Sequence, residues 1–202
     1  SQTNSTGTLL HSHIKPIPLK RGGLELTKTV NSLEIVENQV VFSISSLPDR
    51  PGIAAQIFEK LSEASINVDL IIQATHDGNS NNITFTVNEI ELTKTIEQCE
   101  LITSQLGGDY NFKTKMTKLS IQGAGIMGRP SVSADLFDTL SQANINVRLI
   151  ATSEIKVSCI IEINNLPKAI RFVGDKFKLS ETQIFINPRY KRQNQPAVRG
   201  IA

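Results

Sequence analysis

The sequence predicts an α+β chain in which one small domain, with the element order strand, helix, strand, strand, helix, strand, is used twice in tandem. Two observations predict it. Apolar residues alternate along short runs such as 40–46 and 82–87, and recur at helical spacing between such runs. The same order of elements then begins again at residue 118. Because a strand–helix–strand crossover is right-handed, each copy should be a ferredoxin-like βαββαβ unit, an antiparallel sheet with both helices on one face.

An internal repeat is visible when the sequence is shifted by 79 residues. Residues 50–71 then align with residues 129–150, and 12 of these 22 positions are identical. The recurring residues of the first copy are Arg50, Pro51, Ala55, Phe58, Leu61, Ser62, Ala64, Ile66, Asn67, Val68, Leu70 and Ile71. Twelve identities in 22 positions are more than chance would give, which indicates that the chain uses one domain twice.

The elements of each copy follow from its apolar pattern and its glycines. In the first copy, Ile53, Ile57 and Leu61 are spaced as on one helix face, and Gly107-Gly108 ends the second helix. The first copy is predicted to hold a strand at 40–46, a helix from Pro51, strands at 66–72 and 82–87 with a hairpin turn at 77–81 between them, and a helix at 92–106. The second is predicted to hold a strand at 118–122, a helix at 132–142, strands at 146–151 and 155–161, a helix at 166–177 and a strand at 183–186.

The ends of the chain differ in composition from the two copies, being polar and, at the N-terminal end, rich in proline and glycine. Residues 33–36 read as a short extra strand, with a turn at Asn38-Gln39 leading into the first copy. The expected division is a linker or arm at 1–27, a first domain at 28–116, a second at 117–187 and a basic polar tail at 188–202.

Composition excludes several classes of function. With 39% apolar and 20% charged residues and a net charge of +2, the chain is an ordinary globular sequence without a dedicated nucleic-acid surface. We expect a cytoplasmic protein with no membrane partner, because no run of about 18 apolar residues and no charged-then-apolar leader occurs. Cys99 and Cys159 are too few for a disulfide framework, and the three histidines make no metal set.

The stretch 47–55, Leu-Pro-Asp-Arg-Pro-Gly-Ile-Ala-Ala, joins the first strand to the first helix. Pro51 suits a first helical turn, and Gly52 leaves the first backbone N–H groups open to an anion. Asp49 adds a carboxylate beside them, so the stretch suits a zwitterion. It also fits an ordinary strand-to-helix turn with a capping aspartate.

With residues 65–73 and 82–87, this stretch resembles the first ACT domain of an aspartate kinase of the cyanobacterial type. In the second copy, Gly123-Ala124-Gly125-Ile126-Met127 and residues 150–156 resemble its second ACT domain. The resemblance covers roughly residues 30–187. It implies an allosteric region that binds Thr and/or Lys, restrains an aspartate kinase catalytic domain by feedback inhibition, and forms a homodimer through its ACT domains.

The resemblance also implies that catalysis lies elsewhere. The family's kinase domain opens with a Lys-Phe-Gly-Gly-Thr-Ser phosphate loop that this sequence lacks. ATP and magnesium are therefore expected only in that missing domain, with no cofactor and no catalytic residue here. The chain is expected to be a fragment of a longer enzyme, or alternatively a separate regulatory subunit.

Candidate effector contacts are carried over from the family pattern. They are Asp49, Gly52, Ile53, Ala54, Asn67, Asp69 and Gln73 from the first copy, and Ser133, Asn144, Asn146, Val147, Ser153 and Glu154 from the second. Amides and backbone groups orient a zwitterion, and a carboxylate selects its ammonium. Asn67 and Asn146 also fit turns before strands, and Asp69 also fits a solvated strand position.

The second copy departs from the first at the positions that matter for binding. Gly128 and Ser131 replace Asp49 and Gly52, and Arg148 replaces Asp69. The copies therefore cannot bind alike, and we expect the first loop to hold the effector while the second copy completes the site across an interface. A second hypothesis is an ACT pair that serves mainly for dimerisation, and an enzyme in its own right lacks any supporting residues.

Overall fold

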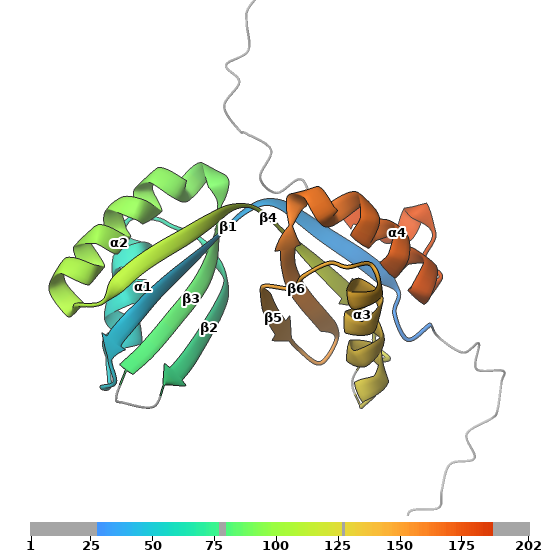
Figure 1. Cartoon of the computed structure of the whole chain (residues 1–202), viewed down its shortest axis with the longest axis horizontal. Coiled ribbons are helices and arrows are strands. Elements are labelled where there is room, and N and C mark those ends of the chain that lie inside the picture. The colour runs from blue at the N-terminus through green and yellow to red at the C-terminus, as the bar shows by residue number, and fades with distance from the viewer. Residues whose placement is uncertain (1–27, 77–79, 127, 188–202) are drawn as a thin grey trace, which may run out of the picture.

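The computed structural model describes residues 28–76, 80–126 and 128–187 as two lobes joined by two long strands, β1 (Ser32–Pro48) and β4 (Asp109–Gln122) (Figure 1). These strands pair with each other antiparallel and belong to one sheet of order β2-β3-β1-β4-β6-β5, while β7 pairs with β1. The helices lie on the outer faces of the lobes, so the inner faces of the sheet turn toward the space between them (Figure 1). The predicted α+β fold of two tandem ferredoxin-like units is confirmed.

We call residues 39–115 lobe 1 and residues 28–36 with 116–187 lobe 2. Besides its part of β1 and β4, lobe 1 contains α1 (Ile53–Glu63), β2 (Val68–His76), β3 (Ser80–Asn88), the short η1 (Glu89–Glu91) and α2 (Leu92–Leu106). Lobe 2 contains α3 (Pro130–Gln142), β5 (Leu149–Thr152), β6 (Lys156–Glu162), η2 (Ile163–Asn165), α4 (Leu166–Phe177), η3 (Glu181–Gln183) and β7 (Ile184–Ile186).

Each lobe has its own aliphatic core between sheet and helices. In lobe 1, Phe42 and Phe85 are fully buried and stack at 5.6 Å between ring centroids, under Ile57 of α1. In lobe 2, Leu119 and Leu136 belong to the equivalent core. Burying one such side chain stabilises the fold by about 1.5–3 kcal/mol, so the two cores hold the helices against the sheet.

The repeat is visible in the hydrogen bonds that follow the first helix of each lobe. Ser65 and Asn144 both have positive φ, 55° and 52°. The next amides, of Ile66 and Ile145, both donate at 2.9 Å to the carbonyl of a leucine in the preceding helix. A 79-residue shift therefore relates the copies in backbone conformation as well as in sequence.

The start of β1 departs from the expected domain division. Val30, Leu33 and Ile35 are buried in the core of lobe 2, although the sequence pattern predicts that residues 28–36 belong to the first domain. Asn38, with φ 57°, makes an irregularity in a continuous strand rather than the expected turn. The extra strand at 33–36 is thus the beginning of β1, and it inserts between β7 and β4 because those strands bury its apolar face.

Several element boundaries also differ from prediction. Helix α1 begins at Ile53 rather than Pro51, and β4 begins at Asp109, nine residues before the strand predicted at 118–122. Ser80 and Asn81, expected in a turn, are paired in β3, while the rest of that turn lies outside the described residues. Strand β5 begins at Leu149 rather than at residue 146, although the Arg148 N–H still donates to the Ile160 carbonyl of β6 at 2.8 Å.

Candidate functional site

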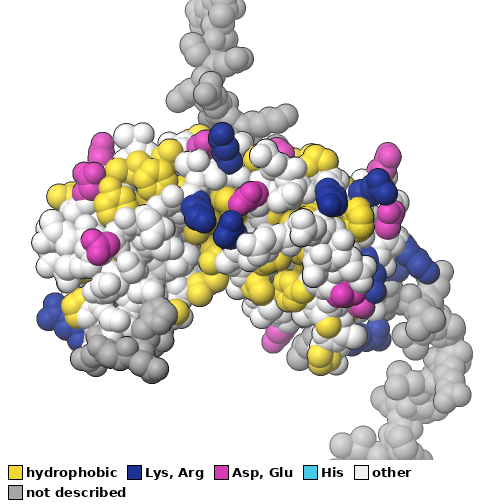
Figure 2. All heavy atoms as spheres, viewed as in Figure 1, with side chains coloured by type: hydrophobic (Ala, Val, Ile, Leu, Met, Phe, Trp, Pro, Cys, Tyr) yellow, Lys and Arg dark blue, Asp and Glu magenta, His cyan; other side chains and the backbone are white. Residues whose placement is uncertain are grey.

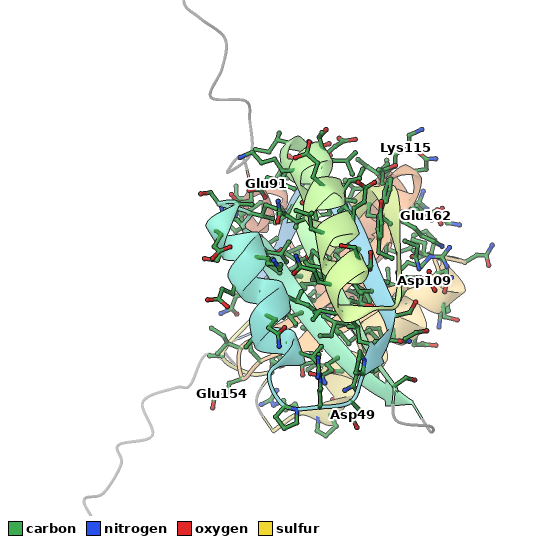
Figure 3. All side chains as sticks on the ribbon, turned by 90° about the vertical axis from the view of Figure 1, so that its left-hand side faces the viewer. Asp49, Glu91, Asp109, Lys115, Glu154 and Glu162 are labelled. Atoms are coloured by element: carbon green, nitrogen blue, oxygen red, sulfur yellow. The ribbon has the colours of Figure 1, made fainter. Side chains whose placement is uncertain are left out.

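The loop before α1 exposes the Asp49 carboxylate at one end of lobe 1 (Figure 3). Its Oδ1 accepts a hydrogen bond of 2.6 Å from Nδ2 of Asn81, which is only 4% exposed. Among the described residues no side chain caps α1, whose N-cap is Gly52. Asp49 is therefore held by β3 and points to solvent, and the capping role considered from the sequence is not seen.

Gly52 occupies a position that favours glycine because its φ is 92°. Ile53 is buried and anchors the helix, while Ala54 is partly buried. With no side chain at its N-cap, the first turn of α1 keeps backbone N–H donors that an anion can use. The loop thus offers amide donors and one carboxylate, the complement of a zwitterion.

The other lobe 1 candidates lie elsewhere in the same chain. The backbone N–H of Asn67 donates to Oε1 of Glu91 at 3.0 Å, at the opposite end of α1 from Asp49. An 11-residue helix is about 16 Å long, so Asn67 and Asp49 do not meet within one chain. Asp69 is ion-paired with Lys118 of lobe 2, and Gln73 is exposed on β2. For Asp69, therefore, an inter-lobe contact replaces the solvated position considered from the sequence.

In lobe 2, the structure brings together three of the candidates. Asn144, Asn146 and Val147 line an open depression of about 430 Å³ beside the end of α3. Ser133 lies near the other end of that helix. Ser153 and Glu154 are exposed in the turn after β5, and Glu154 lies at the same end of the molecule as Asp49 (Figure 3).

Sequence reasoning missed three residues that arrange this region. Asn81 orients Asp49, Glu91 accepts from the backbone N–H of Asn67, and Lys118 neutralises Asp69. Glu91 and Lys118 are buried charged residues, at 9% and 8% exposure. No signal in the sequence pointed to Lys118, because it falls with Ser120 and Gln122 on the polar positions of an alternating strand.

The two cysteines take no part in this chemistry. Burial raises the pKa of both the Cys99 and the Cys159 thiols to about 12. Each thiol therefore stays protonated at neutral pH and packs in the hydrophobic core of its lobe. Within the described ranges, no group of three or more His, Cys, Asp or Glu side chains is placed to hold a metal ion.

Comparison with known proteins relates the chain to one family. Models of ACT domains match residues 40–98 and 119–177. The ligand-free regulatory subunit of aspartate kinase from Thermus thermophilus superposes with a TM-score of 0.70 at 31% identity, covering 74% of this chain and 99% of that one. The chain belongs to the family of aspartate kinase regulatory regions.

Two longer aspartate kinases place this regulatory region within larger chains. The aspartate kinase from Synechocystis superposes with a TM-score of 0.75 at 34% identity, covering 89% of this chain and 31% of that one, which supports the cyanobacterial-type resemblance. Aspartokinase from Thermus thermophilus is 32% identical over 165 residues, 81% of this chain and 41% of the relative. The regulatory region thus spans less than half the length of the curated relatives it matches.

The tandem ACT fold expected from the resemblance is confirmed by these matches. No helix in the part of the chain that the structure describes is long and apolar enough to cross a membrane. The residue-level contacts of the effector site stay predictions, because the comparisons concern the fold and the family.

Proposed function

We propose that this regulatory region binds an end-product amino acid, Thr and/or Lys, and so restrains an aspartate kinase catalytic domain by feedback inhibition. Catalysis, with its ATP and magnesium, belongs to that domain, and the expected setting is the cytoplasm. The observation that carries the proposal is the Asp49 loop: an oriented, exposed carboxylate beside uncapped helix N–H groups. These groups complement the ammonium and the carboxylate of a free amino acid.

The effector site is completed by a second copy of the chain. Within one chain, Asp49 and Asn67 lie at opposite ends of α1, and the lobe 2 depression lies in another lobe. Strands β2 and β5 end the sheet order, and each exposes an isoleucine at equivalent repeat positions, Ile71 at 54% and Ile150 at 46%. Such open edges favour pairing with another chain, which brings second-copy residues to the loop.

Inhibition of a kinase that carries this region tests the proposal. Asp49→Asn should raise the half-inhibitory concentration of Thr or Lys by tenfold or more and leave the uninhibited rate unchanged. Asp109→Asn, which removes an exposed carboxylate elsewhere on lobe 1, is the control. Its half-inhibitory concentration should equal that of the wild type. Equal inhibition of both variants and the wild type would exclude the Asp49 loop as the effector site.

The second candidate is an ACT pair that serves mainly for dimerisation. It is favoured by the ion pair that occupies Asp69 and by the apolar sheet edges. This candidate would be supported instead if the chain forms a stable dimer whose stability is changed by neither Thr nor Lys.

A further inference from the structure

A cavity of about 280 Å³ lies between the lobes on the inner face of the sheet, away from the Asp49 loop. It is lined by Val41, Ser43, Thr84, Asn111, Lys113, Met116, Arg148 and Leu149. Figure 2 shows Lys and Arg side chains beside acidic ones near the middle of the molecule, where the lobes meet. The cavity is slightly smaller than the roughly 300–1,000 Å³ of drug-sized ligand sites, so it suits a small metabolite.

The lining of this cavity combines cations and hydrogen-bond donors with an apolar floor. Lys113 and Arg148 contribute positive charge, while Ser43 and Thr84 contribute hydroxyl groups that hydrogen-bond to each other at 3.0 Å. No carboxylate is among the described residues of the lining. The inner cluster that includes Met116 supplies the floor. Such a lining is complementary to a small molecule with a negatively charged group and a short carbon chain.

Arg148 keeps donors for a ligand even though it is already in an ion pair. Its Nη2 lies 3.0 Å from Oε1 of Glu162, and both side chains are substantially exposed, at 36% and 51%. A guanidinium carries five N–H donors, so one contact with Glu162 leaves others available. Lys113, Arg148 and Glu162 together leave a net positive charge at this cavity.

The internal repeat provides a comparison within the same molecule. The 79-residue shift equates Ser43 of β1 with Gln122 of β4. On the adjoining strands, Lys113 lies opposite Val41, and Glu34 lies opposite Ser120. The same 79-residue shift relates Val41 to Ser120. Lys113 of lobe 1 therefore occupies the position that Glu34 occupies in lobe 2.

In lobe 2 that position holds a carboxylate surrounded by donors. Glu34 accepts hydrogen bonds from Lys156 at 2.7 Å, Gln122 at 2.8 Å and Asn187 at 2.9 Å. In lobe 1 the equivalent positions also carry hydrogen-bond donors, but the cation Lys113 stands where lobe 2 has the Glu34 carboxylate. These lobe 1 positions therefore offer donors to an oxyanion but contain no carboxylate themselves.

We propose that this inter-lobe cavity binds a compact oxyanion, the carboxylate or phosphate of a small organic molecule, which takes in lobe 1 the role of the Glu34 carboxylate in lobe 2. Lys113 belongs to lobe 1 and Arg148 to lobe 2. A bound anion therefore contacts both lobes and stabilises their present arrangement. This site is separate from the Asp49 loop and does not depend on the proposed effector site.

Titration of the 202-residue chain with succinate and with inorganic phosphate, followed by amide NMR shifts at constant ionic strength, tests this proposal. Saturable shifts are expected around Lys113 and Arg148. Saturation by succinate alone identifies a carboxylate site, and saturation by phosphate alone identifies a phosphate site. Lys113→Gln should weaken binding by tenfold or more, and Thr84→Val should weaken it without changing any charge.

Lys94→Gln provides the control, because Lys94 is exposed on α2 and the change in net charge is the same. It should bind the anion within twofold of the wild type, and so should Asp49→Asn. The proposal is overturned if neither anion gives saturable shifts, or if Lys94→Gln weakens binding as much as Lys113→Gln does.

Discussion

At the scale of single residues, Glu34 shows how a partly buried carboxylate is held in lobe 2. Burial alone would raise its pKa, but hydrogen bonds from Lys156 and Asn187, together with the charges of Lys156 and Lys118, outweigh this and hold the pKa below its usual value of 4.5. Because the folded state binds this proton less tightly than the unfolded chain does, Glu34 stabilises the fold fully above that value. The contribution is lost as the pH falls through the lower folded-state pKa.

Glu34→Gln should therefore destabilise the protein at pH 7 and have a smaller effect in acid. Loss of the charge-assisted hydrogen bonds should cost about 1–2 kcal/mol in the free energy of unfolding. Urea unfolding at pH 7 and pH 3 measures the difference, with Glu97→Gln on the exposed side of α2 as the control. A loss that is the same at both pH values would show that the charge of Glu34 is not involved.

At the scale of elements, the Gly123-Ala124-Gly125 loop after β4 is shaped by close packing. The structure shows why glycine stands at two of its three positions. A Cβ on Gly123 would lie 2.1 Å from the Thr29 carbonyl oxygen, and one on Gly125 would lie 2.7 Å from the Thr29 Cα. The glycines admit the backbone at Thr29 and Val30, whose side chain enters the core of lobe 2.

Gly123→Ala should accordingly destabilise the protein by about 2 kcal/mol or more, since the clash is with backbone and cannot be relieved by a rotamer change. Gly174→Ala, in α4, is the control, because a Cβ there would lie in ordinary van der Waals contact with Ile184 Cδ1, at 3.8 Å. That change should be neutral or stabilising by up to about 1 kcal/mol. Thermal unfolding of both variants compares them, and equal stability would contradict the packing account.

At the scale of the whole molecule, the lobes are joined by a partly buried ion pair between Asp69 of β2 and Lys118 of β4. The Lys118 side chain is 11% exposed, so removing Asp69 leaves a desolvated charge. Asp69→Asn and Lys118→Met should each cost about 1–3 kcal/mol, with a coupling energy above about 1 kcal/mol in a double-mutant cycle.

The exposed pair Arg148–Glu162, within lobe 2, is the comparison, and its coupling should stay below about 1 kcal/mol. Denaturant unfolding of both cycles supplies the energies. Equal coupling in the two cycles would mean that the inter-lobe pair is no stronger than a surface pair.

The repeat and its alternating apolar pattern were enough to predict two βαββαβ units, and the helices at 92–106 and 166–177 agree with the structure. What the pattern could not show is that β1 and β4 each pass through both lobes. Leu33 and Ile35 alternate with polar residues whether the segment belongs to the first domain or to the second. Only their packing in the folded chain shows that they belong to the core of lobe 2. The first half of β4, with Lys113, was missed, although Tyr110 and Phe112 alternate there with polar residues and were the available signal.

The candidate site was predictable only as far as local sequence determines local structure. The Asp49 loop and its glycine were found because their conformation depends on neighbouring residues. Asn81 and Lys118 were missed because each acts on a residue distant in sequence, 32 positions away for Asn81 and 49 for Lys118. Pairings of that kind depend on strand order and twist rather than on a motif.

Calorimetric titration of this chain with Thr and Lys, singly and together, tests the regulatory account most directly. The account predicts saturable heat from at least one of them, with affinity reduced tenfold or more, about 1.4 kcal/mol, in Asp49→Ala. The absence of heat from either amino acid, alone or combined, in a chain that forms a stable dimer would contradict it and leave an assembly module.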